Sequence, residues 1–475
     1  MELLAQITGE THLIRERGLL TLKLELQKPD FNLSALEDAI IHYMKLNDTW
    51  ESKQGAFLAC RVLFTERPGS SSANLRQVLV ANLLEHMEHS EVRVRMAASE
   101  TSGRLIAETL AAAGDEEGLS SARLLLSRCL QVAHNCFALA RARDELYHER
   151  EGTSLHAGIA AAEGEEKHHR PEERRHRRSG SYSSKTELLH ESAGWKSLET
   201  ALKTLDHLAV ATPASFLMEP AGIEIKLAPE EEKAKVENAN LTGHHLALLT
   251  LTSTWGFQME AVVSIAVTHL NRFVRETGFH LLTRLITHKA LTLNTVTSDV
   301  ICAGLEDNWS QVRYAATGCV QAFFAALYPN EQPQYFPQLL PRMALNRYYV
   351  AEGVKLLAQQ CWRDVVGLGG VALVTEHLAL IVDYYTSMVK ASNHAVREAA
   401  CHVMAELAAK IDHDALEEHA PRLLDALLMG LRDGSWPVRD AACLGSASFY
   451  RHFSRASAPK EEALWQLWSA HLADV

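Results

Sequence analysis

The sequence predicts an all-α protein in which pairs of helices stack as a helical solenoid. The main observation is a short phrase that recurs along the chain: an aliphatic residue, a basic residue and then small apolar residues at the start of a helical run. Its fullest copies read SQVRYAATG at 310–318, HAVREAACH at 394–402 and WPVRDAACL at 436–444. From Val274 to Val312 the chain runs 38 residues, and from Val396 to Val438 it runs 42. A self-similar period of this length is typical of stacked helical hairpins.

The composition supports this architecture. Hydrophobic residues make up 47% of the 475 residues, enough for a continuous core, and the 25 Gly and 13 Pro fall mostly between apolar helical periods. A chain of this length exceeds one compact core, but in a solenoid each repeat packs only on its neighbours. None of the eight cysteines forms a C-x-x-C pair, so we expect reduced, buried thiols.

Charge and targeting signals bear on partners and location. The net charge of −12 argues against nucleic-acid binding, because that binding depends on Lys and Arg that neutralise phosphates. The N-terminus lacks the basic and apolar regions of a secretory signal. The apolar stretch 367–382 contains Glu376 and His377, which are costly in a bilayer, so we expect a buried helix there. The sequence predicts a cytoplasmic or nuclear protein with protein partners and no membrane partner.

Apolar spacing predicts a first and a second helix in each successive pair. In the first half the pairs are 33–46 with 48–64 and 74–89 with 90–110. In the second half they are 256–270 with 272–287, 294–305 with 308–327, 334–345 with 347–362, 371–390 with 393–410, and 414–431 with 435–453, followed by a last helix at 460–472.

Two polar segments divide the chain. Segment 150–192 is dense in charge, Gly and Ser and has no apolar period, which predicts disorder. Segment 213–240 predicts a long connection with a short extended piece at Ile223–Leu227. We therefore expect four parts: N-terminal repeats at 1–149, a disordered charged insertion at 150–192, a single helix with a long loop at 193–240, and C-terminal repeats at 241–475.

The residues around the phrase have predicted structural roles. An aspartate five residues before the valine can accept backbone N–H bonds at the start of the next helix. We expect the valine and the alanines after it to face inward. The arginine should run along the repeat junction, with its guanidinium bonded to a carboxylate or to a helix-end carbonyl. This predicted signature comprises Asp307, Val312, Arg313, Val396, Arg397, Asp433, Val438 and Arg439.

The pattern of aspartate, valine, arginine and alanine resembles the HEAT-repeat family, within the wider HEAT/armadillo class. The copies at Ile14-Arg15, Val92-Arg93 and Val274-Arg275 match it less fully, and Tyr349-Val350 occupies the expected place after Val312 without an arginine. The resemblance implies a right-handed α-α superhelix of about 9–11 helical hairpins. It also implies a concave face, lined by the second helices, that binds proteins.

The resemblance implies a non-enzymatic scaffold or adaptor and leaves two alternatives open. One is a tubulin- or microtubule-binding array, in which a Trp at the turn before a second helix belongs to the binding edge. Trp50, Trp309 and Trp436 stand at such places, although the turns HSEV, DNWSQ and DGSWP are not basic. The other is a karyopherin-like transport adaptor.

A metal-dependent hydroxylase is the less favoured alternative. HEAT-repeat hydroxylases of the deoxyhypusine type place His-Glu dipeptides on helices to ligate two irons. Here His148-Glu149 and His190-Glu191 border the segment predicted to be disordered, where ligands would lack a rigid frame. His86 and His89 could touch one metal, but no HExxH pattern accompanies them. We therefore assign no catalytic, cofactor-binding or metal-ligating residue, and no cofactor.

The strongest basic cluster is HHRPEERRHRR at 168–178. It fits either a nuclear-localisation or acidic-partner motif, or a solvated charge run, since Glu172 and Glu173 interrupt it. Because Ser181 lies three residues after Arg178, it is a candidate phosphosite for a basophilic kinase, and phosphate there would partly cancel the local charge.

Overall fold

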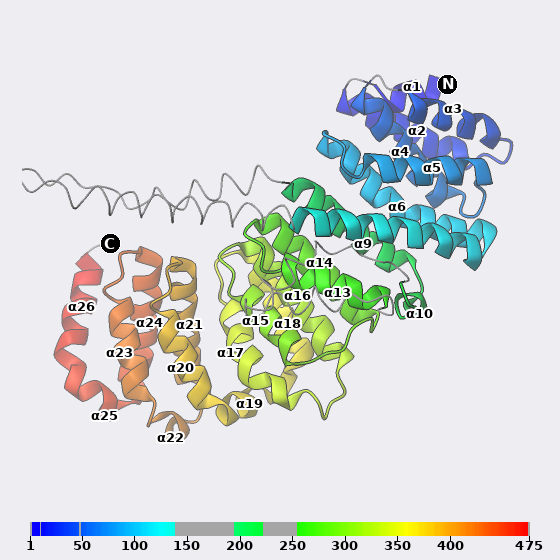
Figure 1. Ribbon diagram of the computed structural model, residues 1–475. Helices are drawn as coiled ribbons and strands as arrows, with labels where there is room; N and C mark the ends of the chain where they lie inside the picture. Colours follow the sequence, from blue (N-terminus) through cyan, green and yellow to red (C-terminus); the bar gives the residue numbers. More distant parts are fainter. Residues whose placement is uncertain (1, 10, 47–48, 138–193, 222–253, 474–475) are drawn as a thin grey trace, which may run out of the picture. The chain divides into compact units, whose positions relative to one another are not determined.

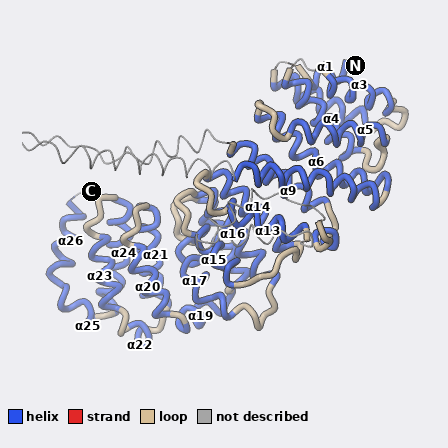
Figure 2. Tube along the Cα trace, viewed as in Figure 1, coloured by secondary structure: helices blue, strands red, loops and turns tan. Residues whose placement is uncertain are grey.

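The computed structural model describes residues 2–9, 11–46, 49–137, 194–221 and 254–473, and these are helical almost throughout (Figures 1 and 2). The predicted all-α architecture of stacked helical pairs is confirmed. Contacts divide the chain into two compact units, unit 1 at Met1–Leu285 and unit 2 at Ile286–Val475. The predicted domain limits near 149, 192 and 240, the charged insertion and the extended piece at 223–227 lie outside the described residues.

Unit 1 begins with three helical pairs. They are α1 (Glu2–Ile7) with α2 (His12–Leu26), α3 (Leu33–Lys45) with α4 (Trp50–Glu66), and α5 (Ala73–His86) with α6 (Val92–Ala113). Residues 115–137 are also helical. The unit continues with α9 (Trp195–Ala211), the short α10 (Ala214–Leu217), and the pair α13 (Trp255–Ala266) and α14 (Arg272–Thr287).

Unit 2 repeats the same arrangement. Its pairs are α15 (Thr295–Leu305) with α16 (Ser310–Ala326), α17 (Phe336–Asn346) with α18 (Glu352–Val365), α20 (Leu378–Met388) with α21 (His394–Lys410), and α23 (Ala420–Gly430) with α24 (Trp436–His452). Short helices connect them: η1 (Pro333–Tyr335), η2 (Gly367–Gly369), α19 (Gly370–Glu376), α22 (His413–Leu416), α25 (Ser454–Ser457) and η3 (Ala458–Lys460). The last helix is α26 (Glu461–Ala473).

Local chemistry sets where the helices begin. A side-chain oxygen at the N-cap accepts a backbone N–H of the first turn, which satisfies one of the donors that a helix start leaves open. The N-caps that do this with Thr, Asn or Ser are Thr11, Asn32, Thr49, Ser72, Thr254, Asn294 and Asn393.

Within each unit the second helices of successive pairs pack on one another, with α9 in the place of a second helix after α6, and first helices also pack on first helices, as α15 does on α17. In unit 1, α4 packs on α6 and α6 on α9; in unit 2, α16 packs on α18 and α21 on α24 (Figure 1). Small residues allow this close approach, since Ala316, Ala400 and Ala442 have no exposed surface. At Gly430 an added Cβ would lie 2.8 Å from the Cβ of Ala442 and 3.0 Å from the Sγ of Cys401. At position 430 there is therefore no room for a side chain larger than the hydrogen of glycine.

Two predicted helices are each broken in the structure. The predicted helix 371–390 is two helices, because His377 (φ −106°, ψ 19°) leaves the helical conformation between α19 and α20. Val374 and Leu378, on the two sides of the break, are both buried. The predicted helix 414–431 is interrupted between α22 and α23, where Pro421 lies in the first turn of α23. Proline has no N–H for a helical hydrogen bond, so it fits a helix start better than a helix interior.

The apolar stretch 367–382 is therefore not one buried helix. Leu368 is fully exposed, and Val371 and Leu380 are about half exposed. In the described part of the chain, no helix alone has the length and apolarity to cross a membrane; α19 with η2 and α20 meet that test only as a pair bent by 87°. The eight cysteines are free, and all but Cys443 are buried. Burial raises the pKa of the Cys401 thiol to about 12, so this group is protonated at neutral pH.

Candidate protein-binding surface

The fourth residue of the second helix is a cation in most pairs. These cations are Arg15, Lys53, Arg95 and Arg275 in unit 1, and Arg313, Lys355, Arg397 and Arg439 in unit 2. Each arginine donates to the carbonyl oxygen six residues earlier, in the turn before its helix, at distances from 2.5 to 3.0 Å. Lys53 reaches the carbonyl of Met44 at 2.5 Å. The side chain thus ties the turn to the helix that follows it.

Arg313 is the most buried member of this set, with 2% of its surface exposed. Its Nε donates to the carbonyl of Asp307 at 2.5 Å, and its Nη1 donates to the carbonyl of Leu305 and to Oδ1 of Asn346, each at 2.6 Å. The guanidinium also lies 4.5 Å from the ring centre of Tyr349. Burial lowers the pKa of Arg313. Because Asn346 ends α17, this one side chain joins two successive helical pairs.

Arg397 joins its neighbour through a carboxylate. Nε and Nη2 donate to the two oxygens of Asp433 at 2.6 and 2.9 Å. The same carboxylate accepts the N–H of Ser435 at 2.8 Å, and hydrogen bonds from Arg397 hold its pKa below the usual range. In the turn before α16, Oδ1 of Asp307 accepts the N–H of Trp309 at 2.9 Å. Both aspartates therefore fix the turn at the start of a second helix.

The valines of the phrase lie in the core. Val312 and Val438 have no exposed surface and Val396 has 4%. Two other assignments of the phrase are wrong, and in the copy at Ile14-Arg15 the aliphatic residue is 44% exposed although Arg15 makes the carbonyl contact. Val92 is 47% exposed, whereas Val94 is buried and Arg95 makes the carbonyl contacts, so this copy begins two residues later. The copy placed at Tyr349-Val350 is instead Val354-Lys355, with Val354 buried and Val350 exposed.

The buried valines of unit 2 are evenly spaced, which was not predicted from the sequence. Buried valines stand at positions 312, 354, 396 and 438, each 42 residues after the one before. Lys53 and Arg95 are separated by the same 42 residues. The copy at Val354 does not match the phrase, because Lys355 stands where the other copies have arginine. The constant spacing of 42 residues is the sequence signal that predicts Val354.

Two clusters of aromatic rings and cations lie at the starts of second helices in unit 1. In the first, the guanidinium carbons of Arg15 and Arg93 lie 5.3 and 4.6 Å from the ring centre of Trp50. In the second, the rings of Trp195 and Phe273 stack at 5.6 Å with an angle of 16° between them. Lys196 lies over the Trp195 ring and Arg272 over the Phe273 ring, at 5.7 and 4.7 Å. We call these four cations and three rings the aromatic–cation clusters.

The clusters supply a basic character that the turns lack. The turn sequences are not basic, but Arg93, Lys196 and Arg272 stand in the first two positions of their helices and lie beside the rings. The side chain of Arg93 is 57% exposed and lies 3.9 Å from a Glu91 oxygen. Cations over aromatic rings keep their charge accessible while their stems are packed. This arrangement can bind acidic side chains of a partner.

Comparisons with known proteins give the following likenesses. The sequence matches no protein-family model, and no curated protein matches it significantly. Among solved structures, an engineered protein is 12% identical and covers 97% of this chain and 91% of its own, with a TM-score of 0.31. Yeast importin-beta (Kap95p) is 11% identical, with a TM-score of 0.37, and the match covers 98% of this chain and 53% of that one. Kap95p solved with RanGDP is 12% identical, with a TM-score of 0.34 and coverages of 98% and 54%.

The chain thus spans about half the length of the Kap95p chains it matches. At 11–12% identity and TM-scores of 0.31–0.37, these likenesses say nothing about the partners of this chain.

The remaining candidate residues fall in different places. Trp309 and Trp436 are 45% and 50% exposed at the starts of α16 and α24. His86 is buried, with its Nδ1 2.8 Å from the Asn82 carbonyl, and its ring stacks on His89 at 5.5 Å. Within the described ranges, no group of three or more His, Cys, Asp or Glu residues could hold a metal ion. Ser181, the basic run 168–178 and both His-Glu dipeptides lie outside the described residues.

Proposed function

We propose that this chain is a non-enzymatic scaffold that binds protein partners through surfaces formed by its second helices. In six pairs an arginine ties the turn to the second helix, and Arg313 and Arg397 also tie one pair to the next, which favours a stack of fixed shape. Second helices also leave aromatic rings and arginines partly accessible at their starts. Aromatic residues and arginine are the types that dominate binding energy at protein interfaces.

The observation that carries the proposal is that two arginines, Arg15 and Arg93, lie over the ring of Trp50. The whole chain has a net charge of −12, yet two cations gather at this one ring, with Glu91 3.9 Å from Arg93. Desolvated cation–ring and cation–carboxylate contacts are stronger than exposed ones. A partner that covers Trp50 with an acidic segment would gain both kinds of contact.

The experiment compares capture of partners by matched variants. Full-length protein is immobilised, and bound proteins are identified by mass spectrometry. We expect the double variant Trp50→Ala with Arg93→Glu to lose specific partners, while Arg363→Glu, which changes an exposed cation in unit 2, retains them. If the bound proteins are the same for wild type and the double variant, the cluster around Trp50 is not the binding surface.

The same cluster favours one more specific candidate, binding of tubulin or microtubules. The family resemblance places a Trp at the corresponding turn of tubulin-binding arrays, and here Trp50 has the basic neighbours that the turn sequences lack. Mixing with purified tubulin, followed by gel filtration and by microtubule sedimentation, tests it. We expect a complex that is lost at high salt and in the double variant; absence of any complex at micromolar concentrations removes this candidate.

The karyopherin-like alternative can be tested in the same format. The probe is Ran, the partner named with Kap95p in one of the solved structures. A complex that forms with Ran and survives in the double variant would favour this alternative over tubulin binding.

A further inference from the structure

Helix α2 carries leucines on two opposite sides, and only one side is buried. Leu22 and Leu26 belong to the core of unit 1 and have no exposed surface. On the other side, Leu13, Leu20 and Leu24 are 60%, 59% and 55% exposed. Residues seven and four apart lie on one side of an α-helix, so these three leucines form a single row along α2, which we call the leucine stripe. A contiguous exposed apolar row of this kind is typical of a contact surface.

The leucine stripe has the spacing of a coiled-coil seam. Seam positions a and d alternate three and four residues apart along a heptad. With Leu13 at position d, the seam of α2 reads Leu13, Arg17, Leu20 and Leu24. The residues beside the seam are Glu16 and Lys23 at position g, and Ile14 and Thr21 at position e, and all four are exposed.

The charges beside the seam match a second copy of α2 that runs antiparallel to the first. In that orientation a residues face d residues, so Leu13 packs on Leu24 of the second copy, and the aliphatic stem of Arg17 packs on Leu20 of the second copy. Position g then faces position g, and Glu16 of each copy lies beside Lys23 of the other. The contact is therefore self-complementary, as a two-fold symmetric interface requires.

A parallel pair of α2 helices lacks this complementarity. In a parallel coiled coil a residues face a residues, and g residues face e residues. Arg17 would then lie beside Arg17 of the second copy, and Glu16 would lie beside the uncharged Thr21. The pattern of charges thus selects the antiparallel orientation.

Glu16 and Lys23 are accessible to a second copy. Glu16 lies 3.7 Å from His12, and both side chains are more than 60% exposed. Lys23 lies 3.3 Å from Glu66 and keeps 53% of its side-chain surface exposed. An ammonium group has three N–H donors, so Lys23 can hold Glu66 and a carboxylate of the second copy at the same time.

We propose that the chain forms a symmetric dimer in which α2 packs antiparallel on α2 of a second copy. Within its own chain α2 packs on the second helix α4, so the dimer continues the packing of second helices from one chain into the next. The seam does not include Arg15, the residue of α2 that lies over Trp50, so the dimer does not depend on the proposed partner surface. An interface of one helix from each copy is small, and we expect a dissociation constant of about 10–100 µM.

The test measures the mass of the full-length chain by sedimentation equilibrium at about 5–300 µM, a range that spans this constant. We expect the average mass to rise toward that of two chains. Glu16→Lys and Lys23→Glu should each weaken the dimer by about tenfold or more, because each variant places like charges in both flanking pairs. An equal mixture of the two variants should form a heterodimer about as tightly as wild type, since one chain then carries lysine and the other glutamate at both positions. Recovery in the mixture also shows that both variants are folded.

The leucine stripe itself is tested by Leu20→Glu, which should weaken the dimer by about tenfold or more. The matched control is Leu124→Glu, because Leu124 is 51% exposed in the helical stretch 115–137 and lies outside the stripe. The control should keep the mass of wild type. A dimer that survives Leu20→Glu, or a mixture of the two charge variants that stays monomeric, overturns the proposal. If another protein covers the stripe instead, the chain alone stays monomeric throughout the range, and the proposal is wrong.

Discussion

Arg397 and Asp433 form two parallel hydrogen bonds, 2.6 and 2.9 Å long, between α21 and the turn before α24. The same guanidinium donates to the carbonyls of Ala391 and Ser392 at 2.9 and 3.0 Å. One side chain therefore holds the turn of its own pair and the turn of the next. Such a planar contact fixes orientation as well as distance, which a single point charge cannot do.

The substitution Arg397→Lys should therefore destabilise the protein even though it keeps the positive charge. A lysine keeps the charge but cannot bond both carboxylate oxygens and both carbonyls, so we expect the free energy of unfolding to fall by about 1.5–3 kcal/mol. The matched control is Arg422→Lys, because Arg422 and Asp383 form a pair that is more than half exposed. That change should cost less than about 0.5 kcal/mol. Equal losses in urea denaturation would contradict the role given to Arg397.

The same pair predicts how stability depends on pH. Hydrogen bonds from Arg397 hold the pKa of Asp433 below its value in the unfolded chain. A carboxyl group with a depressed folded pKa contributes stability above the unfolded pKa, about 3.9, and loses it as pH falls through the folded value. The difference in unfolding free energy between wild type and Asp433→Asn should thus be constant above about pH 5 and shrink below about pH 4. If the difference in unfolding free energy grows as the pH falls, the prediction is wrong.

Arg313 should be the most sensitive of the arginines to substitution. In Arg313→Met the side chain of Asn346 and the carbonyl of Asp307 lose a charged donor in a buried place, and we expect a loss of about 3–5 kcal/mol. Arg439→Met is the control, because Arg439 is half-buried and its carbonyl contacts are longer, at 3.0 and 3.3 Å. It should lose about 1 kcal/mol. Chemical denaturation of both variants and of the wild type measures the two losses in unfolding free energy.

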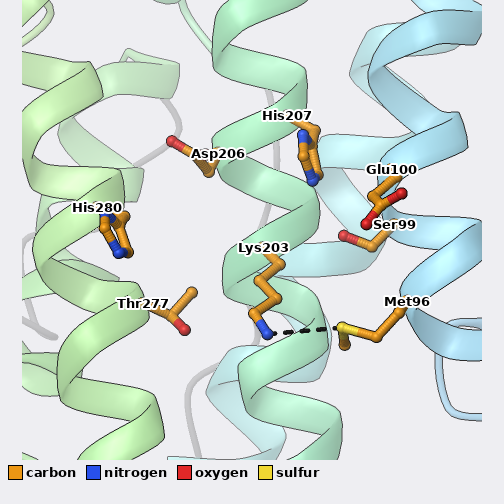
Figure 3. Close-up of a pocket in the computed structure, with 8 residues that line it drawn as sticks. All are labelled: Met96, Ser99, Glu100, Lys203, Asp206, His207, Thr277 and His280. Atoms are coloured by element: carbon orange, nitrogen blue, oxygen red, sulfur yellow. Dashed lines mark hydrogen bonds between the residues drawn. The ribbon is translucent and has the colours of Figure 1, made fainter. Parts of the chain in front are cut away.

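The sequence was enough to predict the fold class, because apolar spacing predicts the helices and the recurring phrase gives the period of the pairs. Individual repeats were harder to place. The sequence predicts a copy of the phrase at Val92-Arg93, but only Val94-Arg95 is followed by two alanines, Ala97 and Ala98, at the same distances as in the other copies, and Val94 is the buried valine. The cleft that α6, α9 and α14 line together (Figure 3) could not be predicted, because its lining comes from three helices that are distant in sequence.

Lys53 and Lys355 occupy the same place in their helices but should respond differently to substitution. Lys53 is 8% exposed and donates to the carbonyl of Met44, and burial lowers its pKa. Lys53→Met removes that donor, and we expect a loss of about 1–3 kcal/mol. Lys355 is paired with Glu352 at 3.9 Å on the surface, so Lys355→Met should change stability by no more than about 0.5 kcal/mol. A loss of stability in Lys355→Met as large as that in Lys53→Met would contradict this difference between the two lysines.

Two glycines inside second helices test how closely the helices approach. At Gly103 an added Cβ would lie 2.6 Å from the carbonyl oxygen of His207 and 3.0 Å from the carbonyl carbon, so α6 and α9 would have to move apart. We expect Gly103→Ala to cost about 1–3 kcal/mol and to widen the cleft beside His207. At Gly318 in α16 nothing lies within 4 Å. Gly318→Ala should therefore stabilise by about 0.5–1 kcal/mol, the ordinary gain of alanine over glycine in a helix. Thermal melts of the two variants should shift in opposite directions, and a shift in the same direction would show that backbone contact between α6 and α9 does not limit the packing.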